Sequence, residues 1–542
     1  MNLLSQRLRR IRQSKQVGHM ANITRGLEKE SLRITPQGFL AKTSHPKTLG
    51  SALTHPRITT DYSEALLEFI TPPRQKISES MAILEELHRF TYNQIGQEYL
   101  WINSMPCMIT SDQDIPIAKY GSSNSAQMKT IYRKGLGQRY GSAMQVIAGI
   151  HYNFSPSDVF WQFLRDEDNA SLPLMDYKTR SYLGLIRNFR RNFWILLYLF
   201  GAAPAVCSSF VKNRCHQLVP LGEDENSLHA PYATSLRMGD LGYQSAAQES
   251  LIVTYNCLED YINSLCQAIT QPYDEYRKVG IRSDNREYRQ LNDCLLQIEN
   301  EFYGLIRPKH ITSSGQAALN ALDTGGIEYI EVRCLDLNPF ESVGVSESQI
   351  RFLDLFLMYC LLEDSPFSDE EEYRQQQENQ RRMVYRGRDP DLTLYDKGKE
   401  RVARQWGQEI IEQLTPIATM LDEYHGDDKY LLCLENEKLK LENQLLTPSA
   451  RILDEVREQK TTFYRWAMNA AIRNREHFLE SALSPKTQQY YERMAEDSLA
   501  KQTQLEAHQE KAFESFLADY YNQYQCRGAA QQRPGSAADR KS

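Results

Sequence analysis

Acidic side chains lie inside segments of this chain that otherwise have the pattern of β-strands. The first segment spans residues 25–34, where Glu28 and Glu30 are separated by Lys29. Successive side chains of an extended chain point to opposite faces, so the two carboxylates share one face about 6–7 Å apart. That spacing suits two acids that each hold a hard cation or that bracket a single one. A solvated edge strand also explains the pattern, so the other acids of the chain must decide between these interpretations.

A second acid lies in a strongly apolar segment. Residues 66–71 are expected to form a strand that ends at Pro72 and Pro73, because proline cannot donate a ladder hydrogen bond. Glu68 has apolar neighbours on both sides within this strand, and Asp61 lies in the connection just before it. A buried acid needs a partner or a metal ion, so this pair extends the candidate cation site.

Two later segments also place polar groups on one strand face. From Met144 the alternation predicts a long strand with Gln145, His151 and Asn153 on the same side. A structural histidine and a site-lining strand both remain open there. In the strand expected over 326–336, Glu331 and Arg333 share a face. They could form a structural ion pair, or they could hold a metal ion and a phosphate.

If these segments converge in space, their acids form a site that needs cations. The candidate metal ligands are Glu28, Glu30, Asp61, Glu68, His151 and Glu331. So many carboxylates in one cavity would repel one another, and oxygen ligands of this kind favour Mg²⁺ or Mn²⁺ over zinc. Arg133, Arg237 and Arg333 would bind phosphate or carboxylate through forked hydrogen bonds. The combination points to ATP-driven activation of a carboxylate or to hydrolysis of a phosphoester.

Composition and motifs exclude several other classes of protein. The chain has 542 residues, a net charge of −7 and an ordinary hydrophobic content of 41%, which argues against a dedicated binder of nucleic acid or of anionic membranes. No Gly-x-x-x-x-Gly-Lys-Ser/Thr loop occurs, and the glycines of residues 129–141 do not match a dinucleotide fingerprint. The apolar run 193–206 is interrupted by Gly201 and Pro204 and is too short to cross a bilayer.

The ten cysteines indicate neither a zinc site nor a redox motif, because no pair has Cys-x-x-Cys spacing. Cys207, Cys334 and Cys360 lie in apolar runs and are expected to be small core residues in a reducing compartment. We therefore expect a cytoplasmic protein.

The chain is expected to divide into four parts. Residues 1–19 are expected to form an N-terminal helix, and residues 20–360, the part that carries the family resemblance given below, a catalytic core. Residues 361–525 predict a helical C-terminal part packed on that core. Residues 526–542 are rich in Gly, Ala, Gln and Arg without an apolar pattern, which predicts a disordered tail.

Many separate segments resemble one enzyme family. They include TRGLEKESLR at 24–33, GSALTH at 50–55, ITTD at 58–61, ALLEFITP at 65–72, GIHYNF at 149–154, YATSLR at 232–237, and residues 326–338. Together they resemble glutamate–cysteine ligase of the gammaproteobacterial type, in the same order and from about residue 20 to 360. Beyond residue 360 the resemblance weakens.

The resemblance implies an α+β fold with a glutamine-synthetase-like, curled antiparallel sheet surrounded by helices. It also implies a reaction in which ATP phosphorylates the γ-carboxylate of L-glutamate and the amine of L-cysteine then displaces phosphate. The product would be γ-glutamylcysteine, in the first step of glutathione biosynthesis. Two or three Mg²⁺ ions, which Mn²⁺ can replace, would be the cofactors of an enzyme expected to act as a monomer.

The same resemblance assigns roles by position. The five acids and the histidine named above would be metal ligands, with Glu331 and Arg333 in catalytic roles and Arg333 against the ATP phosphates. The residues expected to bind the amino acids are Tyr132, Arg133, Gln145, Asn153, Arg237, Tyr243 and Tyr303. Tyr62 stands where relatives carry phenylalanine beside the cysteine pocket, so its hydroxyl puts the acceptor preference in doubt.

Three other functions compete with this one. A ligase that joins glutamate to a different amine would use the same metal ions and the same activation step. A Mg²⁺-dependent phosphohydrolase would turn over ATP or a phosphoester without glutamate or an amine. A helical interaction protein would instead act through its C-terminal half.

Overall fold

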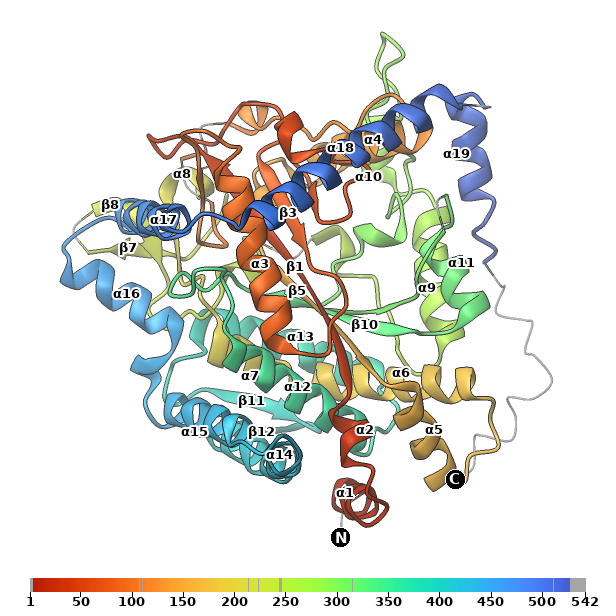
Figure 1. Ribbon diagram of the computed structural model, residues 1–542, viewed down its shortest axis with the longest axis vertical. Coiled ribbons are helices and arrows are strands. Elements are labelled where there is room, and N and C mark those ends of the chain that lie inside the picture. Colours follow the sequence, from red (N-terminus) through yellow and green to blue (C-terminus); the bar gives the residue numbers. More distant parts are fainter. Residues whose placement is uncertain are drawn as a thin grey trace.

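The structure, a computed structural model, describes residues 3–106, 108–109, 111–212, 214–222, 224–242, 246–313, 315–509 and 511–526. Within these residues the central feature is a seven-stranded antiparallel sheet (Figure 1). Its strands are β1 (Ile23–Ile34), β2 (Ile58–Thr60), β3 (Leu66–Ile70), β4 (Tyr99–Leu100), β5 (Ile150–Pro156), β9 (Ile306–Lys309) and β10 (Tyr329–Leu335). The order across the sheet is β2-β3-β1-β5-β10-β9, and β4 pairs with the far end of β1. The predicted α+β class with an antiparallel sheet is confirmed.

Two smaller sheets and many helices surround this sheet. Strands β6 (Ala205–Cys207), β7 (Val219–Leu221) and β8 (Asp224–His229) form one small sheet, and β11 (Thr393–Asp396) and β12 (Lys399–Val402) form the other. The helices are α1 (Leu3–Gln13), α2 (Val17–Ala21), α3 (Ile77–Tyr92), α4 (Asn124–Tyr140), α5 (Asp158–Glu167), α6 (Leu174–Asn192), α7 (Trp194–Phe200), α8 (Ser208–Val211), α9 (Leu258–Thr270), α10 (Asp274–Val279), α11 (Ala318–Gly325), α12 (Glu347–Leu362), α13 (Glu370–Arg386), α14 (Ala403–His425), α15 (Lys429–Glu442), α16 (Pro448–Glu458), α17 (Phe463–Glu480), α18 (Pro485–Ala507) and α19 (Phe513–Tyr521). None of the helices in the described ranges combines the length and the hydropathy needed to cross a bilayer.

Strand β1 organises the sheet, because it pairs with β3 on one side and β5 on the other. Glu30 lies opposite Glu68 of β3, and Glu28 lies opposite His151 of β5. On the next strand, Glu331 lies opposite Asn153 of β5. Directly opposed residues of neighbouring strands point to the same face. The register therefore brings the acidic side chains of β1, β3 and β10 to one side of the sheet.

The other face of β1 carries basic groups that are buried. Arg25 donates two hydrogen bonds of 2.8 Å to Asp354 of α12, and the two side chains are 3% and 0% exposed. The hydroxyl of Tyr430, on α15, also donates to Asp354. This face therefore joins the sheet to α12 and α15, which lie together on one side of it in Figure 1.

Lys29 lies on the same reverse face, between the two acids in sequence. Its Nζ atom is 2.6 Å from Nε2 of His88 on α3, and both side chains are buried. Burial lowers the pKa of Lys29 to about 7. The ring of His88 lies between Phe69 of β3 and Phe478 of α17, with centroid separations of 4.7 and 5.1 Å. The C-terminal helices thus pack directly on the core.

The prediction of a long strand from Met144 is wrong in its first half. Residues Met144–Val146 form a 3-10 turn, and the strand begins at Ile150. The carboxylate of Asp112 accepts hydrogen bonds from the amides of Ser142 and Ala143, which fixes the chain in this turn. Gln145 is therefore presented from a turn, not from a strand.

The cysteines also differ in part from expectation. Cys334 and Cys360 are buried free thiols, as predicted, whereas Cys207 is buried but disulfide-bonded. A further disulfide joins Cys266 of α9 to Cys526. Cys526 was predicted to be the first residue of the disordered tail and is instead fixed by this bond; residues 527–542 lie outside the described residues.

Candidate functional site

A cavity of about 430 Å³ lies between one face of the sheet, helix α4, the segment 298–316 and helix α19. All six predicted metal ligands line it, from four different strands and one connection: Glu28, Glu30, Asp61, Glu68, His151 and Glu331. The chain thus brings together acids that lie as far apart in sequence as residues 28 and 331. The cross-strand register of the sheet produces this convergence.

Three of these residues form a compact group. Nδ1 of His151 lies 3.2 Å from a Glu28 oxygen and 3.7 Å from a Glu331 oxygen. Ligand atoms from all three side chains lie within 4.8 Å of one another. Asn153 donates a 2.9 Å hydrogen bond to the other Glu28 oxygen and so orients that carboxylate. Carboxylate and imidazole groups at these separations can hold one divalent cation.

The electrostatics of the acids also favour cations in the cavity. Burial, together with the charges of Glu28, Asp61 and Glu30, raises the pKa of Glu68 well above its ordinary value. Burial and the charge of Asp61 likewise raise the pKa of Glu30. The ionised forms of Glu30 and Glu68 are thus destabilised by desolvation and by their acidic neighbours, whereas burial of Glu28 is opposed by the hydrogen bond with His151, which helps to hold the pKa of Glu28 below its ordinary value. A divalent cation would remove this penalty, so the residues present fit Mg²⁺ or Mn²⁺.

Glu331 differs from these acids because basic groups surround it. Burial alone would raise its pKa, but Lys309, Arg333 and His151 hold the pKa of Glu331 well below the ordinary value. Its oxygens lie 3.5 Å from Nζ of Lys309 and 3.1 Å from Nη1 of Arg333. The glutamate therefore lies at the boundary between an acidic and a basic part of the cavity.

The predicted arginines also reach the cavity. Nη2 of Arg237 donates a 3.0 Å hydrogen bond to the carbonyl of Arg333, and its Nη1 lies 3.7 Å from the buried Asp336. A Cβ atom at Gly149 would collide with this guanidinium, so a side chain at that position would displace Arg237 from the place described here. Arg133 of α4 lies 3.6 Å from the Asp61 carboxylate and 4.6 Å from the centroid of the Tyr120 ring.

Some of the residues predicted to bind the amino acids line the cavity and others do not. Tyr132, Gln145 and Tyr303 line the cavity, and Nε2 of Gln145 donates a 2.9 Å hydrogen bond to the Tyr303 hydroxyl. Asn153 does not line the cavity and instead supports Glu28 from behind. Tyr243 lies outside the described residues.

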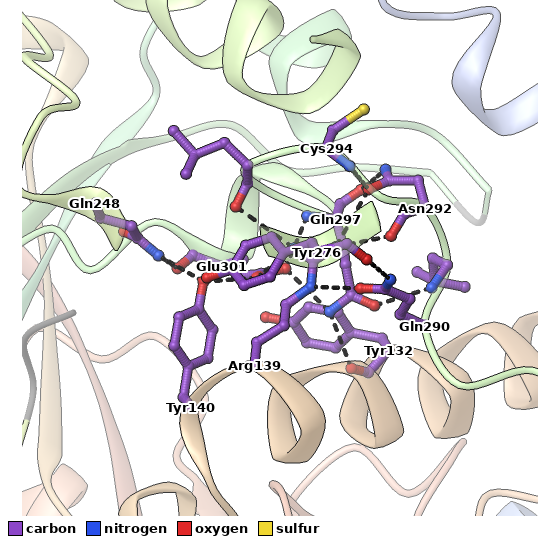
Figure 2. A network of polar contacts seen from close by, with 12 residues as sticks. Tyr132, Arg139, Tyr140, Gln248, Tyr276, Gln290, Asn292, Cys294, Gln297 and Glu301 are labelled. Atoms are coloured by element: carbon purple, nitrogen blue, oxygen red, sulfur yellow. Dashed lines mark hydrogen bonds and ion pairs between the residues drawn. The ribbon is translucent and has the colours of Figure 1, made fainter. Parts of the chain in front are cut away.

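A buried polar network lies behind Tyr132 (Figure 2). Glu301 and Arg139 form an ion pair of 2.9 Å in which both side chains are 0% exposed. Arg139 belongs to α4, and Gln297 connects Glu301 to the same helix a second time, since its Nε2 donates to a Glu301 oxygen and to the carbonyl of Tyr132. Gln248 joins Tyr303 to the same network, because it accepts a hydrogen bond from the Tyr303 amide and donates to the Glu301 carbonyl.

Tyr62 does not present its hydroxyl to the cavity. The ring is 1% exposed, and the hydroxyl lies 2.7 Å from Oγ of Ser142. A Cβ atom at Gly137 would collide with this hydroxyl, so the glycine makes room for it. The hydroxyl thus lies against the turn that carries Gln145 and not among the cavity-lining side chains.

Several residues that line the cavity were not predicted from the sequence: Lys129, Arg307, Lys309, Gln316, Phe516 and Tyr520. For Arg307 and Lys309 the sequence held a signal, because their i, i+2 spacing places two basic side chains on one face of a strand; in the structure Arg307 is the register partner of Glu331. For Phe516 and Tyr520 no local signal existed. They belong to an ordinary amphipathic helix near the end of the chain.

A cavity that joins clustered carboxylates to guanidinium groups, on one face of an antiparallel sheet, is typical of the class of enzymes that bind phosphate groups together with divalent cations. Within this class, a family model described as glutamate–cysteine ligase matches residues 8–383. The glutamate–cysteine ligase of Alcanivorax borkumensis is 49% identical over 526 residues, which cover 96% of this chain and 100% of the relative. That of Saccharophagus degradans is 50% identical over 514 residues, covering 94% and 97%. The chain therefore belongs to the glutamate–cysteine ligase family.

Solved structures agree with this assignment. The glutamate–cysteine ligase of Francisella tularensis, crystallised in complex with AMP, has a TM-score of 0.87 at 35% identity and covers 92% of this chain and 98% of its own. A bifunctional glutathione synthetase from Pasteurella multocida has a TM-score of 0.68 at 25% identity, covering 87% of this chain and 54% of its own. The predicted family is confirmed, and with it an ATP-using ligase of the first step of glutathione biosynthesis.

Proposed function

We propose that this cavity forms γ-glutamylcysteine through a γ-glutamyl phosphate. A γ-carboxylate oxygen of L-glutamate attacks the terminal phosphorus of ATP and ADP leaves. The amine of L-cysteine then attacks the acyl carbon, loses a proton and expels phosphate. The convergence of six potential metal ligands with Arg333 in one cavity is the observation that supports this proposal.

The acids divide into two neighbouring groups that fit divalent cations. Glu28, His151 and Glu331 would hold one Mg²⁺, and Glu30, Asp61 and Glu68 would hold further Mg²⁺, with Mn²⁺ as a substitute. Bound Mg²⁺ would neutralise charge on the ATP phosphates. Because Glu30 and Glu68 are cross-strand partners, the sheet itself fixes the separation between their carboxylates.

The basic residues of β9 and β10 would bind the transferring phosphoryl group. Arg333 is held by Glu331, and its side chain is 14% exposed at the cavity. A guanidinium so oriented can donate two parallel hydrogen bonds to phosphate oxygens. Lys309, which contacts the same Glu331, would add a second positive charge. Stabilisation of charge by preorganised donors is typically the largest catalytic contribution in such reactions.

The remaining residues would position the two amino acids. Arg237 is held between Asp336 and the Arg333 carbonyl, and we assign it to a substrate carboxylate. Asn153 is assigned to the orientation of Glu28. The buried hydroxyl of Tyr62 does not argue against cysteine as the acceptor, because it is bonded to Ser142 and does not line the cavity. The side chains that would line the amino-acid subsites are Tyr132, Arg133, Gln145 and Tyr303, together with the predicted Tyr243.

One assay tests the proposal and its rivals. The enzyme is incubated with Mg-ATP, glutamate and one acceptor at a time: cysteine, 2-aminobutyrate, serine or a diamine. We expect the mass of γ-glutamylcysteine, with phosphate release that requires both glutamate and cysteine. Phosphate release without glutamate or amine would instead establish the phosphohydrolase, and preference for a diamine would establish a different ligase. Cell fractionation and sedimentation would test the predicted cytoplasmic location and monomeric state.

A substitution tests the metal-binding role. Glu68→Gln keeps the side-chain volume but removes a charged ligand. Loss of a residue that only orients a metal ligand lowers activity by at most about 100-fold, so loss of a ligand itself should lower the rate of ligation by more than that. Glu79→Gln is the matched control, because Glu79 is an exposed acid of α3. Normal activity of Glu68→Gln at limiting Mg²⁺ would contradict the assigned role.

A further inference from the structure

The C-terminal helix α19 forms part of the cavity wall. Phe516 and Tyr520, one turn apart on this helix, line the cavity together with Met128 and Tyr132 of α4. The same four side chains belong to one apolar cluster, which also contains Ile298. The aromatic wall therefore adjoins Tyr132 and differs in character from the acidic face of the sheet.

Helix α19 is held in this position by contacts along its length. Phe513 packs edge-on against Tyr288, with ring centroids 5.4 Å apart, and Leu517 is buried beside it. The Tyr521 hydroxyl donates a 2.9 Å hydrogen bond to the carbonyl of Gln297. Gln297 also donates a hydrogen bond to the carbonyl of Tyr132, so the helix is joined to the part of the cavity wall that carries Tyr132.

The segment after α19 is anchored as well. Gln523 accepts a 2.9 Å hydrogen bond from the amide of Ala317 and donates one of 2.8 Å to the carbonyl of Gly315. Cys526 is bonded covalently to Cys266 of α9. Figure 1 shows α18 running across one end of the molecule past α4 before the chain enters α19. The wall is thus fixed at its C-terminal end by a covalent bond.

The chemistry of this wall matches the side chain of the acceptor. A thiol on a single methylene group behaves as a small hydrophobe, so it is accommodated by aromatic and aliphatic groups better than by carboxylates. A rigid aromatic wall also limits the length of the side chain that fits. We propose that Phe516 and Tyr520 are specificity-determining residues, which close the acceptor subsite around a short, weakly polar side chain. This inference rests on the proposed assignment of Tyr132 to an amino-acid subsite, which we take to be the subsite of the acceptor.

A purely structural role for α19 predicts a different outcome. If the helix only braced α4 and the segment 288–298, its loss would affect all substrates together. A wall of the acceptor subsite should instead change the ratio between acceptors and leave the KM values of ATP and glutamate unaltered. The comparison needs acceptors without a thiol, because these leave the Cys266–Cys526 bond intact.

The test compares 2-aminobutyrate with norleucine, which is two methylene groups longer. Phe516→Ala and Tyr520→Ala should raise the ratio of kcat/KM for norleucine to that for 2-aminobutyrate by about tenfold, the scale of discrimination by an apolar pocket. Ser515→Ala, at an exposed position on the same helix, should leave the ratio unchanged. Phe516→Leu keeps the packing apolar and serves as a second variant if an alanine variant does not fold.

The possible outcomes separate this inference from the proposed function. A raised ratio with unaltered KM values for ATP and glutamate supports the inference. Ligation of 2-aminobutyrate with the same ratio in every variant, or an equal loss for all substrates, overturns it while the proposed function stands. Absence of ligation by the unaltered enzyme overturns both.

Discussion

The buried ion pair between Glu301 and Arg139 makes a quantitative prediction. Both side chains are 0% exposed, so Glu301→Gln leaves a guanidinium in the interior without its counter-charge. Removal of one partner from a buried pair typically costs about 3–5 kcal/mol. Arg139 keeps its hydrogen bonds to Gln290 and to the Asn292 carbonyl, so the charge is still partly solvated by the protein. We therefore expect a loss of about 3 kcal/mol of unfolding free energy.

Urea unfolding measures this loss as a lower midpoint with an unchanged slope. Arg139→Met should cost a similar amount, because it leaves the carboxylate unpaired. The double variant Arg139→Met/Glu301→Gln removes both charges, and it should lose less than the sum of the single changes by about 1–3 kcal/mol. The KM values for the amino acids should rise more than that for ATP, because the network supports Tyr132 and Tyr303.

Two results would refute this reasoning. A cost of less than about 1 kcal/mol for Glu301→Gln would mean that the pair behaves like one at the surface. Strict additivity in the double variant would mean that the two charges do not interact. Either result would also remove the basis for expecting a selective effect on the amino-acid substrates.

Three further predictions follow from the site. Arg333→Lys should lower kcat by about 10²–10³-fold, the cost of losing a preorganised donor, because an ammonium group cannot form the paired hydrogen bonds of a guanidinium. Near-normal turnover in a steady-state assay would exclude a role for Arg333 in binding the transferring phosphoryl group. The pKa of Glu68 is raised by burial and by the neighbouring acids, so the protonated carboxyl stabilises the fold at acid pH and this contribution is lost as the pH rises through that pKa. The increase in Tm on adding Mg²⁺ should therefore grow with pH. An increase in Tm that is the same at every pH in differential scanning fluorimetry would contradict this. Cys526→Ser should speed hydrogen exchange in α19 but not in α12; an unchanged exchange rate in α19, measured by mass spectrometry, would show that side-chain contacts alone hold the helix.

Much of the site was predictable because strand alternation is a local rule. Glu28 and Glu30 share a face for geometric reasons, and Glu68 stands out as an acid among apolar neighbours. A strand that buries one face also has a defined register, which explains why these acids meet. The failure at residues 144–149 has an equally physical cause. Alternation continued through that segment, but the carboxylate of Asp112 binds two amides of the chain and stabilises a turn.

Other features could not be predicted because they depend on distant segments. The Cys266–Cys526 bond joins residues 260 positions apart, and cysteine spacing does not determine such a pairing. Phe516 and Tyr520 reach the cavity only because α18 carries the chain back across the molecule. No local pattern distinguishes their helix from one that merely covers a surface.

The pairing of Lys29 with His88 has a consequence for how the sheet assembles. A shift of β1 by one residue relative to its neighbours would exchange its two faces. Lys29 would then point toward the substrates, while Glu28 and Glu30 would enter a compartment of aromatic rings on the reverse side. Both placements are unfavourable, so the charges that serve the chemistry also discriminate against misaligned strands during folding.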